Sequence, residues 1–116
     1  MGSSRDATIA DLAASAAKAA TLLKALSNEH RLLILCHLIT ERELTVGALV
    51  ERVGLSPSAL SQHLARLRDE GLVSYRRESQ TLFYSVADPR AGRLLERLRE
   101  IFCADLAPAR SRSRHA

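Results

Sequence analysis

The chain has 116 residues, of which 47% are hydrophobic and 26% charged, a balance typical of a soluble globular protein and not of a disordered or fibrous one. This length fits one domain that is small enough for dimerisation to help it bury surface. The Ala-rich stretch that begins at Ile9 is interrupted by Asp11 and Lys18, so no run is long enough for a membrane span or a signal sequence. We therefore expect a cytoplasmic protein.

The charge and the cysteines narrow the function classes further. A formal charge of +4 and a pI near 9.7 suit a polyanionic partner. The two cysteines, Cys36 and Cys103, lack the CxxC or CxxxC spacing of a zinc finger or a thioredoxin-like motif. A secreted disulfide scaffold is also excluded, which leaves an isolated pair of thiols.

Apolar residues that recur every three or four positions predict a first helix over 9–26. Ser27 or Asn28 can cap a second helix over 29–40, which is apolar nearly all round and is therefore expected at the centre of the fold. The polar residues 1–8 and the Arg- and Ser-rich residues 107–116 are expected to be flexible, so that the domain spans 9–106.

Capping residues mark the next two helices. Thr45 is expected to cap a short third helix that stops at Gly54, because glycine readily adopts the left-handed conformation that ends helices. Ser56 followed by Pro57 opens a fourth helix, which closes on Gly71.

A β-hairpin and a last helix complete the predicted fold. The stretch 72–87 holds two runs rich in Val, Tyr, Phe and Thr around a polar turn near 78–80, which predicts two strands. Asp88 and Pro89 then start a fifth helix that continues to about residue 106. The expected fold is mainly α (α+β), with about five helices and a two-stranded β wing.

Two short helices joined by a turn and followed by a hairpin are the order of a winged helix-turn-helix, in which the second short helix reads DNA. A helical projection of the fourth helix places three leucines on one face and small or polar residues on the other. Such residues can bond to base edges and phosphates in the major groove, while arginines in a wing can hold phosphates. The residues expected to bind DNA are Ser56, Ser58, Ser61, Gln62, His63, Arg66, Arg76 and Arg77.

The alternative is that the polar face is only solvated and that the arginines provide solubility. The cap, turn, helix and wing agree with one another, and this agreement favours DNA binding over a solvated face. Double-stranded DNA is therefore the expected partner, and no membrane is expected to bind.

Three segments carry a family resemblance: KALSNEHRLLIL, LSPSALSQHLARLRDEGLV and YRRESQTLFYSV. They resemble the ArsR/SmtB family of small dimeric winged-helix repressors, over roughly residues 20–102. The resemblance implies a homodimer built on the first and fifth helices, an inverted-repeat operator, and release of DNA when an inducer binds.

The metal sites of that family have no match here. In the segment ELTVGALV, Thr45 and Gly47 stand where the family's metal-sensing members carry two thiols, and the fifth helix contains no histidine. Zinc usually takes about four ligands in a tetrahedron. His30 and His37 offer no obvious set, and a surface or packing role is expected for both. We expect no metal and no cofactor, although a thiophilic metalloid held between chains stays open.

The residues alone leave the role of the thiols open. Cys36 shares a helix face with Leu32 and Ile39, which favours packing in the core, where cysteine behaves as a small hydrophobe. Cys103 projects away from the apolar stripe of the fifth helix, on the side of Arg99, and is not obviously a core residue.

One branch of the family, the sulfide-responsive and biofilm growth-associated repressors, is similar in having one cysteine in the second helix and one near the end of the fifth. The resemblance implies that reactive sulfur species link Cys36 and Cys103 by a disulfide or polysulfide bridge and release the DNA, which derepresses genes of the sulfide-detoxification type. Thiol exchange with a persulfide is reversible, as such a switch requires.

Three other functions are alternatives to this one. They are an ArsR-type regulator that responds to a thiophilic metalloid, a DNA-binding regulator without an inducer, and a thiol enzyme. The enzyme is disfavoured because the chain lacks a CxxC motif, a phosphate loop and any Ser-His-Asp or paired-carboxylate arrangement that would activate a nucleophile.

Overall fold

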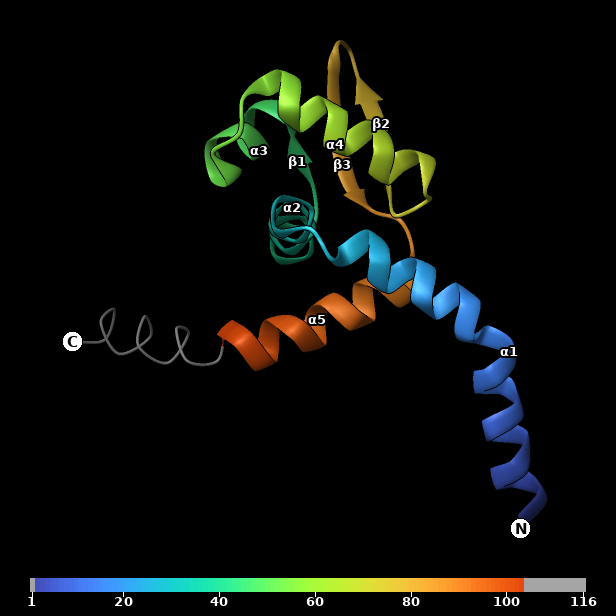
Figure 1. The fold of residues 1–116 in the computed structure, drawn as a ribbon. Helices are drawn as coiled ribbons and strands as arrows, with labels where there is room; N and C mark the ends of the chain where they lie inside the picture. Colours follow the sequence, from blue (N-terminus) through green and yellow to red (C-terminus); the bar gives the residue numbers. More distant parts are fainter. Residues whose placement is uncertain (1, 104–116) are drawn as a thin grey trace.

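A computed structural model describes the backbone of residues 2–103 and the side chains of residues 9–102. All five predicted helices and both predicted strands are present in it, as Figure 1 shows, and a short additional strand precedes the third helix. The predicted basic tail, 107–116, lies outside the described residues, as does the predicted end of the fifth helix. The elements are α1 (Gly2–Leu26), α2 (Glu29–Glu41), β1 (Leu44–Thr45), α3 (Val46–Val53), α4 (Pro57–Asp69), β2 (Val73–Glu78), β3 (Thr81–Val86) and α5 (Pro89–Cys103).

One predicted helix boundary was wrong, and one short strand was not predicted. Helix α1 begins at Gly2, seven residues before the predicted start at Ile9. Because no proline interrupts residues 2–8, the Ala-rich helix continues through this polar stretch. The sheet has three strands and not two, since Leu44 and Thr45 pair with β3. A strand of two residues is too short to show the alternation by which strands are recognised in a sequence.

Three helices begin with the cap that the sequence predicts. In each case a short side chain accepts a hydrogen bond from a backbone N–H in the first turn, which would otherwise have no partner in the helix. The capping residues are Asn28, Thr45 and Ser56, whose side-chain oxygens lie 3.0 to 3.1 Å from the backbone nitrogens of Arg31, Ala48 and Ala59.

The sheet forms the wing. Its strand order is β1-β3-β2 and all of its pairs are antiparallel, so β3 lies in the centre. Tyr84 of β3 pairs with Leu44 on one side and with Tyr75 on the other, and its side chain is buried. The hairpin formed by β2 and β3 extends past α4 in Figure 1, which leaves its turn accessible.

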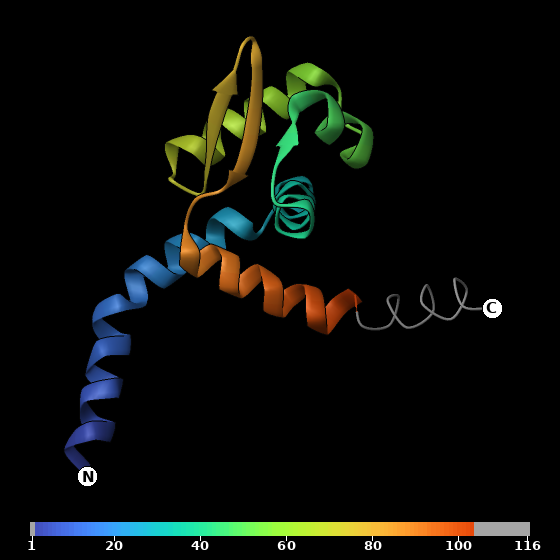
Figure 2. The same ribbon diagram turned by 180° about the vertical axis from the view of Figure 1, so that it is seen from behind.

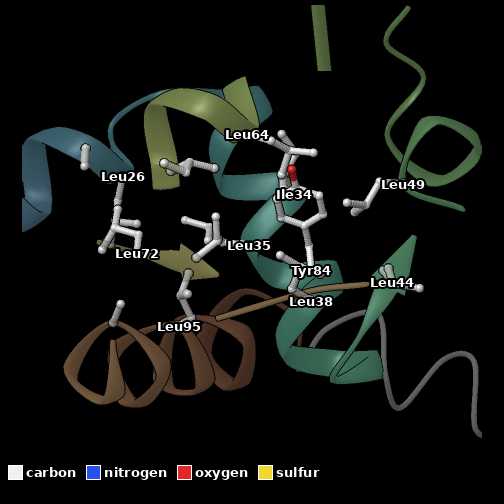
Figure 3. Close-up of a cluster of buried hydrophobic side chains, with 14 of the residues drawn as sticks. Leu26, Ile34, Leu35, Leu38, Leu44, Leu49, Leu64, Leu72, Tyr84 and Leu95 are labelled. Atoms are coloured by element: carbon white, nitrogen blue, oxygen red, sulfur yellow. The ribbon is translucent and has the colours of Figure 1, made fainter. Parts of the chain in front are cut away.

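Helix α2 is the centre of the core, as its apolar sequence predicts. Ile34, Leu35 and Leu38 are at most 1% exposed. Figure 3 shows leucines from the surrounding helices and Tyr84 from the sheet directed toward these three side chains. One contiguous apolar cluster therefore joins the helix-turn-helix to α5. Its other fully buried side chains are Leu49, Leu60, Leu64, Leu67 and Leu95.

The elements fall on two sides of α2. Figures 1 and 2 show α3, α4 and the sheet on one side, and α1 and α5 on the other. Helix α5 packs against α2, whereas much of α1 extends away from the rest of the fold. In the part of the chain that the structure describes, no helix is long and apolar enough to cross a membrane.

Two glycines of the helix-turn-helix should respond to alanine in opposite directions. Gly54 ends α3 with φ +81°, and Gly47 lies in the first turn of the same helix; a Cβ would meet no atom within 4 Å at either position. Gly54→Ala should therefore lower the free energy of unfolding by about 1 kcal/mol through backbone strain alone. Gly47→Ala should raise it by up to about 1 kcal/mol, because alanine is the better helix former.

Urea denaturation of both variants at one protein concentration measures this difference. Equal effects of the two substitutions would contradict the left-handed cap at Gly54, because only the backbone conformation distinguishes the two positions.

Candidate DNA-binding face and thiol pair

Helix α4 presents the two faces that the sequence predicts. Leu60, Leu64 and Leu67 are at most 1% exposed, and they hold the helix against the core. Because these leucines recur at intervals of four and three, the opposite face is directed to solvent. The residues on that face are exposed and polar: Ser58, Ser61, Gln62 and Arg66.

This outer face suits the major groove. Gln62 can donate to and accept from the edge of an adenine at the same time, and the guanidinium of Arg66 can bind a guanine or a phosphate. Between them Ala65 is small, which allows the helix to approach the bases closely. A helix that is fixed on its inner side by three buried leucines holds these groups in a defined direction.

Ser56 has a structural task in addition to its expected contact with DNA. Its Oγ accepts a hydrogen bond from the backbone nitrogen of Ala59 at 3.1 Å, which caps α4, and Pro57 follows as the first helical residue. The hydroxyl proton of Ser56 can still donate to a phosphate. The same side chain can therefore position the helix and contact DNA.

The structure distinguishes the two wing arginines. Nε and Nη2 of Arg76 donate to the two carboxylate oxygens of Glu43 at 2.8 and 3.1 Å, and its Nη1 donates to Glu78 at 3.1 Å. The guanidinium also lies 4.5 Å from the ring centre of Phe83. The hydrogen bonds from Arg76 lower the pKa of the Glu43 carboxyl, although partial burial opposes this shift.

Arg77 differs from its neighbour. In the described part of the chain it forms no ion pair with a carboxylate, and its side chain is exposed on β2. Arg76 would have to leave two carboxylates to bind DNA, whereas Arg77 would not. Sequence reasoning missed this distinction because Glu43 lies 33 positions before Arg76, and they meet only because β1 and β2 both pair with β3.

His63 lies at the edge between the two faces of α4. Its side chain is half-buried, and the centre of its ring lies 6.1 Å from that of His30, in the first turn of α2. For His30, for which a surface or packing role is predicted, the structure shows a neighbouring imidazole, that of His63. No spacing in the sequence signals this contact across 33 residues.

The two thiols belong to helices that pack together. Cys36 is half-buried in α2 against the core cluster. Helix α5 packs on α2, and a methyl group at Gly92 would lie 3.7 Å from Cδ1 of Ile39. Cys103 is the last residue of α5, and its side chain lies outside the described residues. Among the side chains that are described, no group of three His, Cys, Asp or Glu residues is placed to hold a metal ion.

A capped helix-turn-helix with an outward polar helix and a β wing defines a winged-helix DNA-binding transcriptional regulator. Comparison with known proteins then identifies the family. Residues 28–75 match the bacterial regulatory proteins of the arsR family. The transcriptional activator HlyU of Vibrio cholerae serotype O1 is 52% identical over 75% of this chain and 80% of its own length.

A second relative and a solved structure agree with this match. The biofilm growth-associated repressor of Xylella fastidiosa is 39% identical over 81% of this chain and 82% of its own. The solved structure of reduced HlyU from Vibrio cholerae superposes with a TM-score of 0.75 at 48% identity and covers 80% of this chain and 97% of that one. The chain therefore belongs to the ArsR family of bacterial regulatory proteins, which are DNA-binding regulators and not enzymes.

Proposed function

We propose that this ArsR-family regulator is a homodimeric repressor whose affinity for an inverted-repeat operator falls when reactive sulfur species bridge Cys36 and Cys103. The observation that carries the proposal is the position of the thiols. Cys36 lies in the central helix α2, and Cys103 ends α5, the helix that packs on α2. A bridge between them would join the core of the DNA-binding unit to a peripheral helix.

The chemistry needs only the thiols and a persulfide. A thiolate of the protein attacks the outer sulfur of an organic persulfide, takes up that sulfur and releases the organic thiolate. The second thiolate then attacks the inner sulfur of the new protein persulfide, which forms a disulfide and expels hydrosulfide. If a second persulfide molecule first converts the other thiol into a persulfide as well, its terminal sulfur attacks the inner sulfur of the first persulfide, which gives a trisulfide bridge and expels hydrosulfide. Cellular thiols reverse either product by the same exchange.

Exposed apolar residues on the two outer helices support the dimer. Ile101 and Phe102 in the last turn of α5 are 58% and 72% exposed. On α1, Ile9, Leu12 and Leu23 are more than half exposed. Large apolar side chains in such numbers are unusual on a monomer surface, and burial against a second copy would remove them from water. Movement of α5 would then change the separation of the two recognition helices.

One relative agrees with repression, and a solved structure of another specifies a redox state. The Xylella fastidiosa relative is a biofilm growth-associated repressor, which agrees with repression of transcription. A solved structure of the Vibrio cholerae relative is of reduced HlyU, so the redox state is specified for that protein. In this chain, the same state would be the form that binds DNA.

Operator affinity at constant salt, before and after treatment with an organic persulfide, tests the switch. We expect treatment to weaken binding by the wild type about tenfold or more, within the range usual for coupled sites. Cys36→Ser and Cys103→Ser should each bind DNA like the untreated protein and should not respond. Mass spectrometry should show the two cysteine peptides joined, with zero or more additional sulfur atoms.

An equal response of wild type and Cys103→Ser would refute the bridge. Arsenite is the control for a metalloid sensor: release of DNA by arsenite and not by persulfide would replace the proposed inducer. Failure of the reduced wild type to bind any fragment of its own promoter region would refute the repressor itself.

A further inference from the structure

Four basic or titratable side chains gather where α2 begins beside α4. His30 and Arg31 occupy the first turn of α2, and His63 and Arg66 lie one turn apart on α4. The ring centres of His30 and His63 are 6.1 Å apart, with the ring planes inclined at 57°. This ring contact brings the start of α2 to α4, two segments that are distant in the sequence.

Among the described residues, none of the four members of this cluster forms a salt bridge with a carboxylate. Nη1 of Arg31 makes one long hydrogen bond, at 3.4 Å, to the carbonyl oxygen of Ala25 at the end of α1. Its Nε is shielded from solvent, and no hydrogen-bond acceptor of the described chain reaches it. With one long hydrogen bond and no salt bridge among the described residues, the guanidinium of Arg31 has other N–H groups that an anion could satisfy.

Two other arginines of the domain, unlike those of the cluster, are paired with carboxylates. Arg52 is paired with Glu41, and Arg76 is paired with Glu43 and Glu78. The chain thus compensates positive charge with carboxylates beside the wing and between α2 and α3, but not at the start of α2. Solubility alone does not require basic side chains to lie close together, because their positive charges repel one another.

The location of the cluster indicates which anion it would bind. Arg66 belongs to the exposed side of α4, and Gln62, which we expect to contact bases, directly precedes His63. A helix seated in the major groove has the phosphates of the two strands at its edges. His63 and its neighbours lie along such an edge of α4.

We infer that His30, Arg31, His63 and Arg66 form a site for one backbone phosphate of the operator, and that His63 takes up a proton when this phosphate binds. The inference rests on the proposed function, since it needs operator binding through α4. It assigns His30 and Arg31 of α2 to the DNA interface, which otherwise consists of the recognition helix and the wing.

The direction of the pH dependence follows from the charges that face His63. Partial burial lowers the pKa of His63 from its usual value near 6.5, and the positive charges of Arg31, His30 and Arg66 lower it further. A bound phosphate reverses the sign of the field and raises the pKa of His63 in the complex. Between the two pKa values the complex holds more protons than the free protein, so operator affinity rises as the pH falls.

The test is the operator affinity of the reduced wild type between pH values of about 5.5 and 7.5 at constant salt, since linkage predicts an affinity that depends on pH. We expect the affinity to rise by at most about tenfold per pH unit for each protomer, the limit for uptake of one proton. His63→Gln should bind with little dependence on pH. His37→Gln removes a histidine from the same helix as His30, seven residues from it, and should keep the dependence of the wild type.

The arginines are tested by salt. Arg31→Gln should reduce the slope of log affinity against log salt by about one unit for each protomer, because one phosphate contact is lost. A wild type that binds equally at every pH, or a His63→Gln protein with the slope of the wild type, would overturn the inference while leaving the repressor intact. Absence of DNA binding at every pH would instead show that the proposed function itself is wrong.

A spectroscopic measurement covers the case in which a variant does not fold. The imidazole resonances of His63 in the wild type report its pKa directly, with and without operator DNA. We expect a higher pKa in the complex, and the control resonance of His37 should move less. Equal pKa values of His63 in the two states would overturn the inference without any substitution.

Discussion

Replacement of Gln62 by alanine should lower the affinity for the operator by about tenfold to a hundredfold for each half-site, because a bidentate contact with a base contributes about 1–3 kcal/mol. The affinity for DNA of scrambled sequence should hardly change, since contacts with phosphates remain. Gln62 is exposed on α4, so the substitution removes no core contact. Fluorescence anisotropy with operator and scrambled duplexes at one salt concentration measures both affinities.

Two arginine variants serve as controls for charge. Arg77→Ala should weaken binding to both duplexes equally and reduce the salt dependence, as expected for a phosphate contact. Arg90→Gln also removes one positive charge, but from the start of α5, where Arg90 lies near Asp88. It should change neither affinity much. A Gln62→Ala protein that retains the specificity of the wild type would exclude α4 as the reader of the sequence.

Replacement of Leu35 by alanine should lower the free energy of unfolding by about 3–4 kcal/mol, which is a large part of the stability of a typical domain. Leu35 is fully buried in the centre of α2, where Figure 3 shows it among side chains from several elements. Its truncation removes apolar burial and leaves a cavity that the neighbours fill only partly. Urea denaturation followed by circular dichroism measures the change.

Leu33 provides the matched control on the same helix. Its side chain is 40% exposed, so Leu33→Ala should cost less than about 1 kcal/mol in the monomer. Both variants must be compared at one protein concentration, because the stability of the proposed homodimer would depend on it. Similar losses for Leu33→Ala and Leu35→Ala would contradict the orientation of α2.

Local features of the sequence predicted most of the fold. Helix caps act within three residues, so Asn28, Thr45 and Ser56 could be assigned from the chain alone. The recurrence of leucines in α4 likewise determined which face is buried, and therefore which face can meet DNA. The family followed from the same segments, because they carry the helix-turn-helix and its wing.

The features that the sequence did not predict have a common cause: they depend on contacts between residues that are far apart in the chain. The pairing of Leu44 with Tyr84 creates a third strand, and it brings Glu43 to Arg76 across 33 residues. A periodic pattern reports the environment of one segment and does not report which other segment it will meet. The wing arginines therefore looked equivalent in the sequence and differ in the structure.

The amino-acid sequence by itself determined the class of the protein, the recognition helix and the presence of two thiols, because capping and amphipathic periodicity are local properties. Only the tertiary structure decided that α5 packs on the helix of Cys36, that Arg76 is held by carboxylates, and that His30 lies beside His63. These relations depend on how α2 is surrounded, and the burial of Ile34, Leu35 and Leu38 against several other elements fixes that arrangement.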